Sequence, residues 1–297
     1  MYAAALRNNG LALLALAAVV DSSSAYFSRL AAIDGFTMAS GRGLFAFLFI
    51  LALLVLHDGR GTWRALVGIG VWGLVFATLN SAGMIMNILS LKLTAVANFF
   101  MIFATAPFAA AIAGRLVLDE KLDATTLLAA IAGMVGIAVM MFSGARSGGL
   151  IGDLLALCVV MTYSAIVLLA RYHKFDVLPA ICVTTLFSFI FALPFADFTV
   201  MPARDIGVLA IFGIFQLGLG NILIFKAVSR IPAAQSGLLG ILSAAFAPIW
   251  VFVLLGEVPP PATLAGGAII LTAAAAHLVW TIYRARRTPA GPVPFAI

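Results

Sequence analysis

The first candidate for chemistry is an acidic residue in the middle of an apolar segment. Asp21 lies about 10 residues from either end of the apolar run at 10–31, and serines at 22–24 follow it. A carboxylate at the centre of a membrane helix costs about 2.5–3.5 kcal/mol, so it has to be paired, protonated or in contact with water. We therefore predict that Asp21 lines a cavity, binds substrate and carries a proton across the membrane. The alternative is a structural ion pair with Arg42 or Arg29.

Arg42 is a second ionisable residue inside an apolar run, the one at 36–56. Its planar guanidinium can hold a carboxylate through two parallel hydrogen bonds. Arg42 is therefore a candidate to bind the carboxylate of a substrate, or to neutralise Asp21. A long side chain at this depth can also extend to the membrane surface, and we expect Arg29, which lies closer to that surface, to do so.

Amide and aromatic side chains are candidates in four further apolar runs. Asn80, Asn98 and Gln216 are the amides, and Phe99 directly follows Asn98. Tyr163 lies in the middle of the run at 150–170. Convergent polar groups among aromatic rings suit an amphiphilic organic ligand, so we predict that all five residues bind substrate. The alternative is structural, because amides inside membranes commonly bond between helices and aromatic rings commonly only pack.

The composition shows which elements must position these residues. Of the 297 residues 64% are hydrophobic and 9% are charged, and the mean hydropathy is +1.18. Soluble domains average about 25% charged residues, and a disordered chain cannot stay this apolar. Because a membrane-spanning helix uses about 20 residues, we predict an all-α membrane protein with ten transmembrane helices. The predicted segments are 10–31, 36–56, 65–90, 93–115, 124–143, 150–170, 177–196, 206–228, 232–256 and 262–283, and residues 285–297 are expected to form a disordered tail.

The same composition argues against several classes of protein. Ten helices leave no room for a soluble catalytic domain, and the chain has no GxSxG, HExxH or phosphate-loop motif, so we expect no enzyme. Cys158 and Cys182 lie inside apolar runs without metal-ligand spacing, so we expect no metal and no cofactor. The net charge of +6 comes from cations scattered between apolar runs, which argues against nucleic-acid binding.

The positions of the cations predict the orientation. Most of the 17 Lys and Arg residues fall in alternate loops, beginning with the N-terminus, and cytoplasmic loops carry the excess of Lys and Arg. We therefore expect a multi-pass protein of the bacterial inner membrane with both termini in the cytoplasm.

The two halves of the chain contain similar segments. In the first half, Leu93–Ala97 opens a helix that runs through Ala106-Pro107 and ends at Leu118-Asp119-Glu120. In the second half, 231–235 opens a helix that runs through Ala247-Pro248 and ends at Leu255-Gly256-Glu257. A Gly-bearing helix follows each glutamate. We predict two five-helix repeats, 1–148 and 149–284, and the odd number of helices per repeat inverts the second one.

This arrangement resembles the EamA-type drug/metabolite transporter superfamily. The residues that carry the resemblance are 93–120 and 225–257, with the glycines that follow each segment, and Arg42 also sits where many members of the group have an arginine. The resemblance implies transport by alternating access between the two halves, with the substrate path at their interface.

We therefore expect a secondary active transporter that exports a small organic metabolite, such as an amino acid, or an amphiphilic drug. Its partners would be this substrate, the lipid bilayer and protons as a candidate coupling ion, and it would work as a monomer or a homodimer. Two alternatives stay open, an uptake permease for a small metabolite and a membrane-embedded assembly or signalling subunit.

Overall fold

The computed structural model describes residues 2–118, 124–147, 149–173, 175–199, 201–228, 238–256 and 258–287. Within these ranges every regular element is a helix. The two glutamates of the repeated motif, Glu120 and Glu257, lie outside the described residues, as do the last ten residues of the expected tail.

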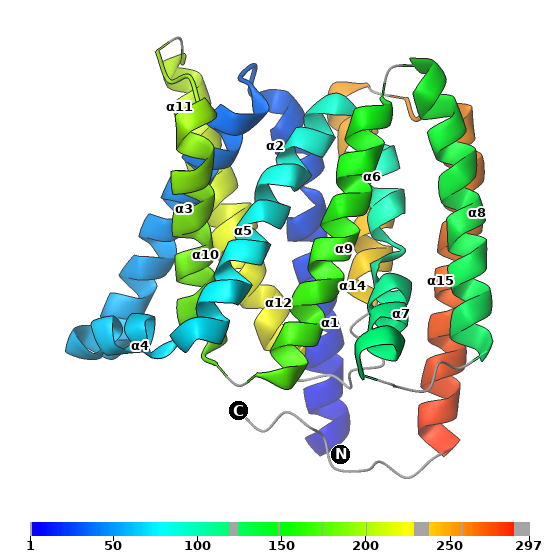
Figure 1. The fold of residues 1–297 in the computed structure, drawn as a ribbon, viewed down its shortest axis with the longest axis horizontal. Coiled ribbons are helices and arrows are strands. Elements are labelled where there is room, and N and C mark those ends of the chain that lie inside the picture. Colours follow the sequence, from blue (N-terminus) through cyan, green and yellow to red (C-terminus); the bar gives the residue numbers. More distant parts are fainter. Residues whose placement is uncertain are drawn as a thin grey trace.

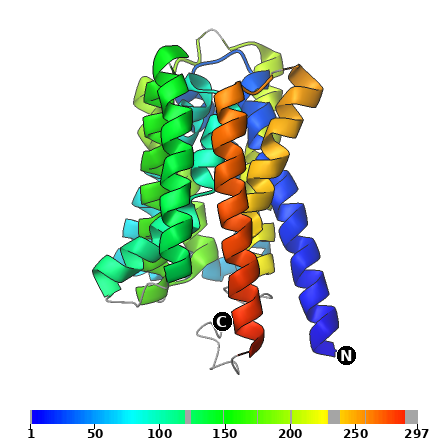
Figure 2. The same ribbon diagram turned by 90° about the vertical axis from the view of Figure 1, so that its right-hand side faces the viewer.

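The helices form one bundle whose long elements run side by side (Figures 1 and 2). Among the described residues, seven helical stretches are long and apolar enough to cross a membrane, so the count of ten remains a prediction. The elements are α1 (Tyr2–Ser22), α2 (Ser24–Leu30), α3 (Gly35–Asp58), η1 (Gly59–Gly61), α4 (Thr62–Gly68), α5 (Gly70–Leu93), α6 (Val96–Phe103), α7 (Ala106–Leu118), α8 (Ala124–Ser147), α9 (Leu150–Tyr172), α10 (Val177–Ala192), η2 (Leu193–Phe195), α11 (Ala203–Ile211), η3 (Phe212–Leu219), α12 (Gly220–Val228), α14 (Leu238–Leu255) and α15 (Pro261–Arg287).

Several predicted spans are broken where the sequence suggested one continuous helix. The first span divides at Ser23, whose hydroxyl donates to the carbonyl of Val20. The fourth divides before Ala106, next to Thr105, whose hydroxyl donates to Ile102. Hydroxyl groups that bond to the preceding turn compete with the helical pattern and bend it. The eighth span contains η3, a π-helix. Such helices are rare overall, and those that do occur are often found at functional sites.

The first helix of each half runs in the opposite direction to the other. In Figure 1 the chain enters α1 at the lower end of the bundle and enters α9 at the upper end. The chain leaves α15 at the same end at which it enters α1. The helix α15 continues to Arg287, so the prediction of a disordered tail is wrong for residues 285–287, which are helical.

The Gly-bearing helices of the two halves, α8 and α15, pack against each other. A Cβ atom at Gly136 would lie 2.7 Å from the carbonyl oxygen of Gly266 and 2.6 Å from Ile270 Cγ1. Small residues allow such close approach, and in a membrane this dispersion contact replaces the hydrophobic effect as the force between helices.

We predict that Gly136→Ala destabilises the protein, because the added methyl group forces two backbones apart. Overpacking of this kind costs about 1–3 kcal/mol. The control is Gly240→Ala on α14, where nothing lies within 4 Å of the new Cβ atom, and where alanine is the better helix former. Thermal unfolding in detergent should show a lower midpoint for Gly136→Ala alone. Equal midpoints would contradict the close packing of α8 and α15.

Candidate functional site

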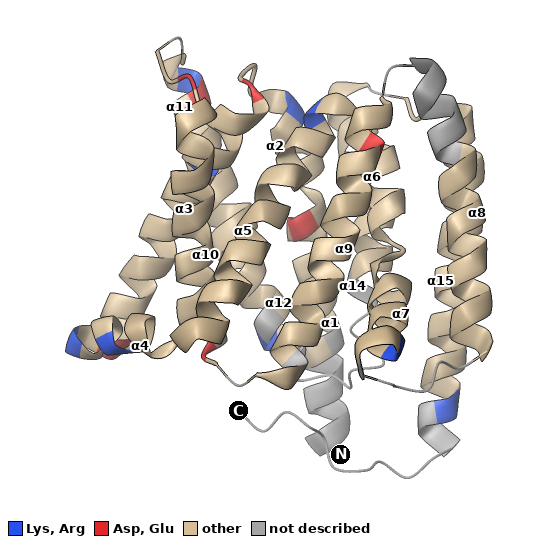
Figure 3. Ribbon diagram, in the orientation of Figure 1, with Lys and Arg blue, Asp and Glu red and all other residues tan. Residues whose placement is uncertain are grey.

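A cluster of polar side chains surrounds Asp21 inside the bundle. Asp21 lies in the last turn of α1, and the Gln216 amide on η3 donates to its Oδ1 atom over 3.5 Å, a long hydrogen bond. Ser243 on α14 is close enough to interact with the same carboxylate, but it makes no hydrogen bond of ordinary geometry. In Figure 3 most charged segments gather near the two ends of the bundle, and one acidic segment lies away from both ends.

Arg42 contributes the opposite charge to this cluster. Its side chain is only 2% exposed, its Nη2 atom donates to the carbonyl of Met84 over 2.9 Å, and its guanidinium lies 5.0 Å from the ring centre of Phe212. A Cβ atom at Gly213 would overlap the Arg42 carbonyl, so a glycine is needed for η3 to approach α3 here. Arg42 interacts electrostatically with Asp21, but the two groups do not come within ion-pair distance.

Three polar atoms of the cluster have no hydrogen-bond partner among the described residues. They are Arg42 Nε, Gln216 Oε1 and Ser243 Oγ. Buried polar atoms are nearly always bonded, so a group of unbonded ones marks a place where a ligand or water binds. Arg42 Nε is a donor that belongs to the cation, whereas Gln216 Oε1 and Ser243 Oγ are acceptors that lie beside the carboxylate of Asp21.

Tyr163 gives evidence of an accessible space next to this cluster. Its side chain is 40% exposed, although it lies on the opposite side of α9 from the exposed residues Leu154, Cys158 and Met161. Tyr163 also lies within electrostatic range of Asp21 and makes an edge contact with the Phe103 ring, 5.4 Å away. Its exposed surface therefore faces the interior of the bundle and not the lipid.

Other aromatic rings pack next to Tyr163 and Phe103. The Phe103 ring stacks on Phe99 with a centroid distance of 5.9 Å, and Phe99 is 1% exposed, so Phe99 packs behind Phe103 in the core. Trp250 on α14 donates to the Ser22 hydroxyl over 3.0 Å, directly beside Asp21. Neither Trp250 nor Ser243 could be singled out by residue type, because one tryptophan and one serine are ordinary in an apolar run.

Of the two other predicted amides, Asn80 lies at the edge of the cluster around Asp21, and Asn98 lies apart from this cluster. Asn80 is half-buried on α5, one turn before Met84, whose carbonyl accepts the bond from Arg42. Asn98 belongs to a separate network, in which its amide nitrogen donates to both carboxylate oxygens of Asp153, over 3.1 and 3.3 Å, and its oxygen accepts from the Thr263 hydroxyl.

We call this second set, Thr94, Asn98, Asp153 and Thr263, the end network. Thr94 donates to Asp153 over 2.6 Å, and Asp153 is completely buried in the first turn of α9. Thr94 and Asn98 come from the α5–α6 junction of the first half, whereas Asp153 and Thr263 begin α9 and α15 in the second half. The Arg29 guanidinium, which was a candidate partner of Asp21, instead donates to the Thr94 carbonyl over 2.9 Å.

Comparisons with known proteins agree with the fold and the repeat. The family model described as the EamA-like transporter family matches residues 8–142 and again residues 150–279. No curated protein matches the chain. A solved structure titled "Crystal structure of protein" is similar with a TM-score of 0.63 and 17% identity, over 93% of this chain and 99% of that one, which shows a shared fold.

We predict that Thr263→Val destabilises the protein, because it leaves the Asn98 oxygen buried without its donor. Hydrogen bonds between membrane helices are worth about 0.6–1.7 kcal/mol, so the unfolding midpoint should fall by an amount of that order. The matched control is Thr272→Val, a change at an exposed position of the same helix. Identical melting curves for the two variants would mean that the end network does not hold the helices together.

Proposed function

The chain belongs to the EamA-like transporter family, and from this premise we propose that it is a secondary active transporter that exports a small organic metabolite, such as an amino acid, or an amphiphilic drug. Substrate would pass between two inverted halves, 1–148 and 149–284, by alternating access. We place the protein in the bacterial inner membrane with both termini in the cytoplasm.

The observation that carries this proposal is the separation of Asp21 and Arg42. Both are charged side chains deep in the bundle, and they are not paired with each other. Leaving two buried charges unpaired is expensive, and a ligand that pairs with both removes that cost. A zwitterion fits these requirements, since its ammonium group complements Asp21 and its carboxylate complements Arg42.

The unbonded atoms fit a zwitterion in this orientation, with its ammonium group at Asp21 and its carboxylate at Arg42. Gln216 Oε1 can accept a hydrogen bond from the ammonium group beside Asp21. The Ser243 hydroxyl, which also lies beside Asp21, can accept from the same ammonium group, and Arg42 Nε can donate to the carboxylate. The accessible Tyr163 ring, with Phe103 behind it, provides an apolar surface for the organic part of the substrate.

Asp21 is also the candidate for coupling to protons. Moving a charge through the membrane interior is expensive, so a carboxylate that alternates between the two sides benefits from crossing in its neutral form. A proton that binds Asp21 on the outside and leaves on the inside would drive substrate outward. This exchange needs no nucleotide and no cofactor.

The end network fits the alternation of access. It joins the two halves at the end of the bundle where α9 begins, and all its buried polar groups are bonded. We infer that this end is closed here, and that these bonds break when the halves rotate. One chain contains both halves, so a monomer suffices for transport, and a homodimer would contain two independent paths.

We predict that Asp21→Asn abolishes proton-driven transport, because the amide cannot exchange a proton. Substrate exchange should be weakened but retained, because the amide keeps the shape of the side chain and its oxygen still accepts a hydrogen bond from the ammonium group. The assay is uptake of labelled amino acids and amphiphilic cations into proteoliposomes with an imposed pH gradient. The control is Asp176→Asn, at an exposed position before α10.

Two results would count against this account. Undiminished proton-driven transport by a well-folded Asp21→Asn protein would exclude Asp21 as the carrier. Loss of folding in Asp21→Asn would instead assign Asp21 a structural role as the partner of Arg42, because that substitution removes the nearest anion from a buried cation.

A further inference from the structure

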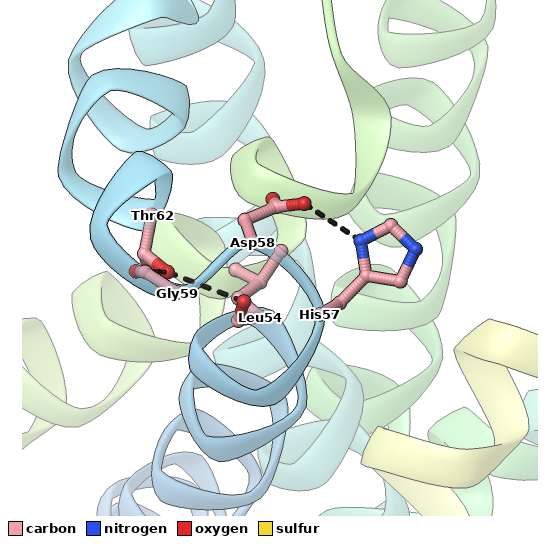
Figure 4. A network of polar contacts seen from close by, with 5 residues as sticks. All are labelled: Leu54, His57, Asp58, Gly59 and Thr62. Carbon is pink, nitrogen blue, oxygen red and sulfur yellow. Dashed lines mark hydrogen bonds and ion pairs between the residues drawn. The ribbon is translucent and has the colours of Figure 1, made fainter.

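The corner between α3 and α5 holds a short helix across the end of the bundle. Figure 1 shows α4 lying crosswise to the long helices, at the end where the chain enters α1. The chain turns at Gly59, whose φ of 54° favours glycine. The Thr62 hydroxyl then bonds to the carbonyls of Gly59 and Leu54, over 2.9 and 3.2 Å, as Figure 4 shows. These bonds fix the direction of α4.

The two faces of this segment differ sharply. Leu66 and Ile69 turn inward and pack on a core cluster that includes Ile50 and Phe76. The outward face carries two cations and two large apolar side chains, namely Arg60, Trp63, Arg64 and Val67, all of them exposed. Trp63 is 73% exposed and Val67 is 62% exposed. We call these four residues the corner face.

The cations of the corner face are not neutralised by the protein. Asp58 is the nearest carboxylate in the sequence, and it bonds to the His57 ring over 2.6 Å (Figure 4). Within the described part of the chain, neither Arg60 nor Arg64 has a hydrogen bond or an ion pair. The corner face therefore presents two free guanidinium groups beside a tryptophan.

We propose that the corner face binds the headgroups of anionic phospholipids, with Arg60 and Arg64 on the phosphates and Trp63 and Val67 in the boundary between headgroups and acyl chains. Guanidinium groups match phosphate oxygens through paired hydrogen bonds. Tryptophan side chains gather at this depth of a membrane, and basic groups next to it attract anionic lipids. The charge complementarity and the crosswise direction of α4 favour a lipid surface over a soluble partner.

The position of Trp63 can be measured from its fluorescence. The full chain and its Trp63→Phe variant are placed in liposomes that carry bromine at either a shallow or a deep acyl position, and the difference between the two proteins isolates Trp63. We expect strong quenching by shallow bromine and weaker quenching by deep bromine. A difference signal that neither bromine quenches would place α4 in water and overturn the proposal.

The preference for anionic lipid needs its own test. Native mass spectrometry of the purified full chain, titrated with phosphatidylglycerol or with phosphatidylcholine, counts bound lipids directly. We expect Arg60→Gln and Arg64→Gln each to weaken phosphatidylglycerol binding by about fivefold without changing phosphatidylcholine binding. The matched control is Arg204→Gln, at an exposed position of α11.

Either of two outcomes would contradict this preference. One is equal loss in Arg204→Gln, which would make the effect one of net charge alone. The other is full competition by glycerol 3-phosphate, which has the phosphate but no acyl chains, since it would remove the requirement for a lipid. These tests do not depend on the transported substrate.

Discussion

Hydrocarbon offers no hydrogen bonds, so each polar group that the chain carries into the bundle has to find a partner inside the protein or face enclosed water. Most groups in this structure do so locally. The hydroxyls of Ser28, Ser164 and Thr184 donate to the carbonyls of their own helices. The end network solves the same problem over three helices and leaves no buried atom unbonded in the described structure. The cluster around Asp21 is different, because three of its polar atoms stay unbonded among the described residues, and for this reason we propose it, and not the end network, as the binding site.

Irregular backbone gathers around that cluster. Asp21 lies directly before the break between α1 and α2, and Gln216 lies on the π-helix η3. Phe103, which contacts Tyr163, ends α6 just before the break to α7. Interrupted helices are tolerated at membrane depth only where protein surrounds them or where they line a cavity. In transporters such interrupted helices carry the binding site, so backbone and side chains independently point to the same region.

Sequence alone was enough to predict most of the helical segments and to single out the two charged residues of the proposed site. Long apolar runs separated by charged or glycine-containing loops predicted the helical segments, and charges inside such runs are rare enough to single out Asp21 and Arg42. The breaks at Ser23 and Thr105 were missed, because hydropathy does not show whether a hydroxyl bonds to its own helix. The bonding of Asn98 to Asp153 was missed for another reason, since these residues are 55 positions apart and only tertiary packing brings them together. Ser243 and Trp250 were missed because their residue types are ordinary in an apolar run.

We propose that Tyr163 and Asp21 face an enclosed space that water can reach, and cysteine accessibility on α9 tests this proposal. Tyr163→Cys and Met161→Cys are compared in a Cys158→Ala background, since Cys158 is exposed whereas Cys182 is buried. Met161 is 65% exposed on the side of α9 opposite Tyr163, where lipid would surround it. A hydrophilic thiol reagent acts on thiolates, which form only in contact with water. We expect the reagent to modify the cysteine at 163 in proteoliposomes and to leave the cysteine at 161 unmodified. An unreactive cysteine at 163 in a folded protein would contradict the accessible space, and with it the proposed binding site.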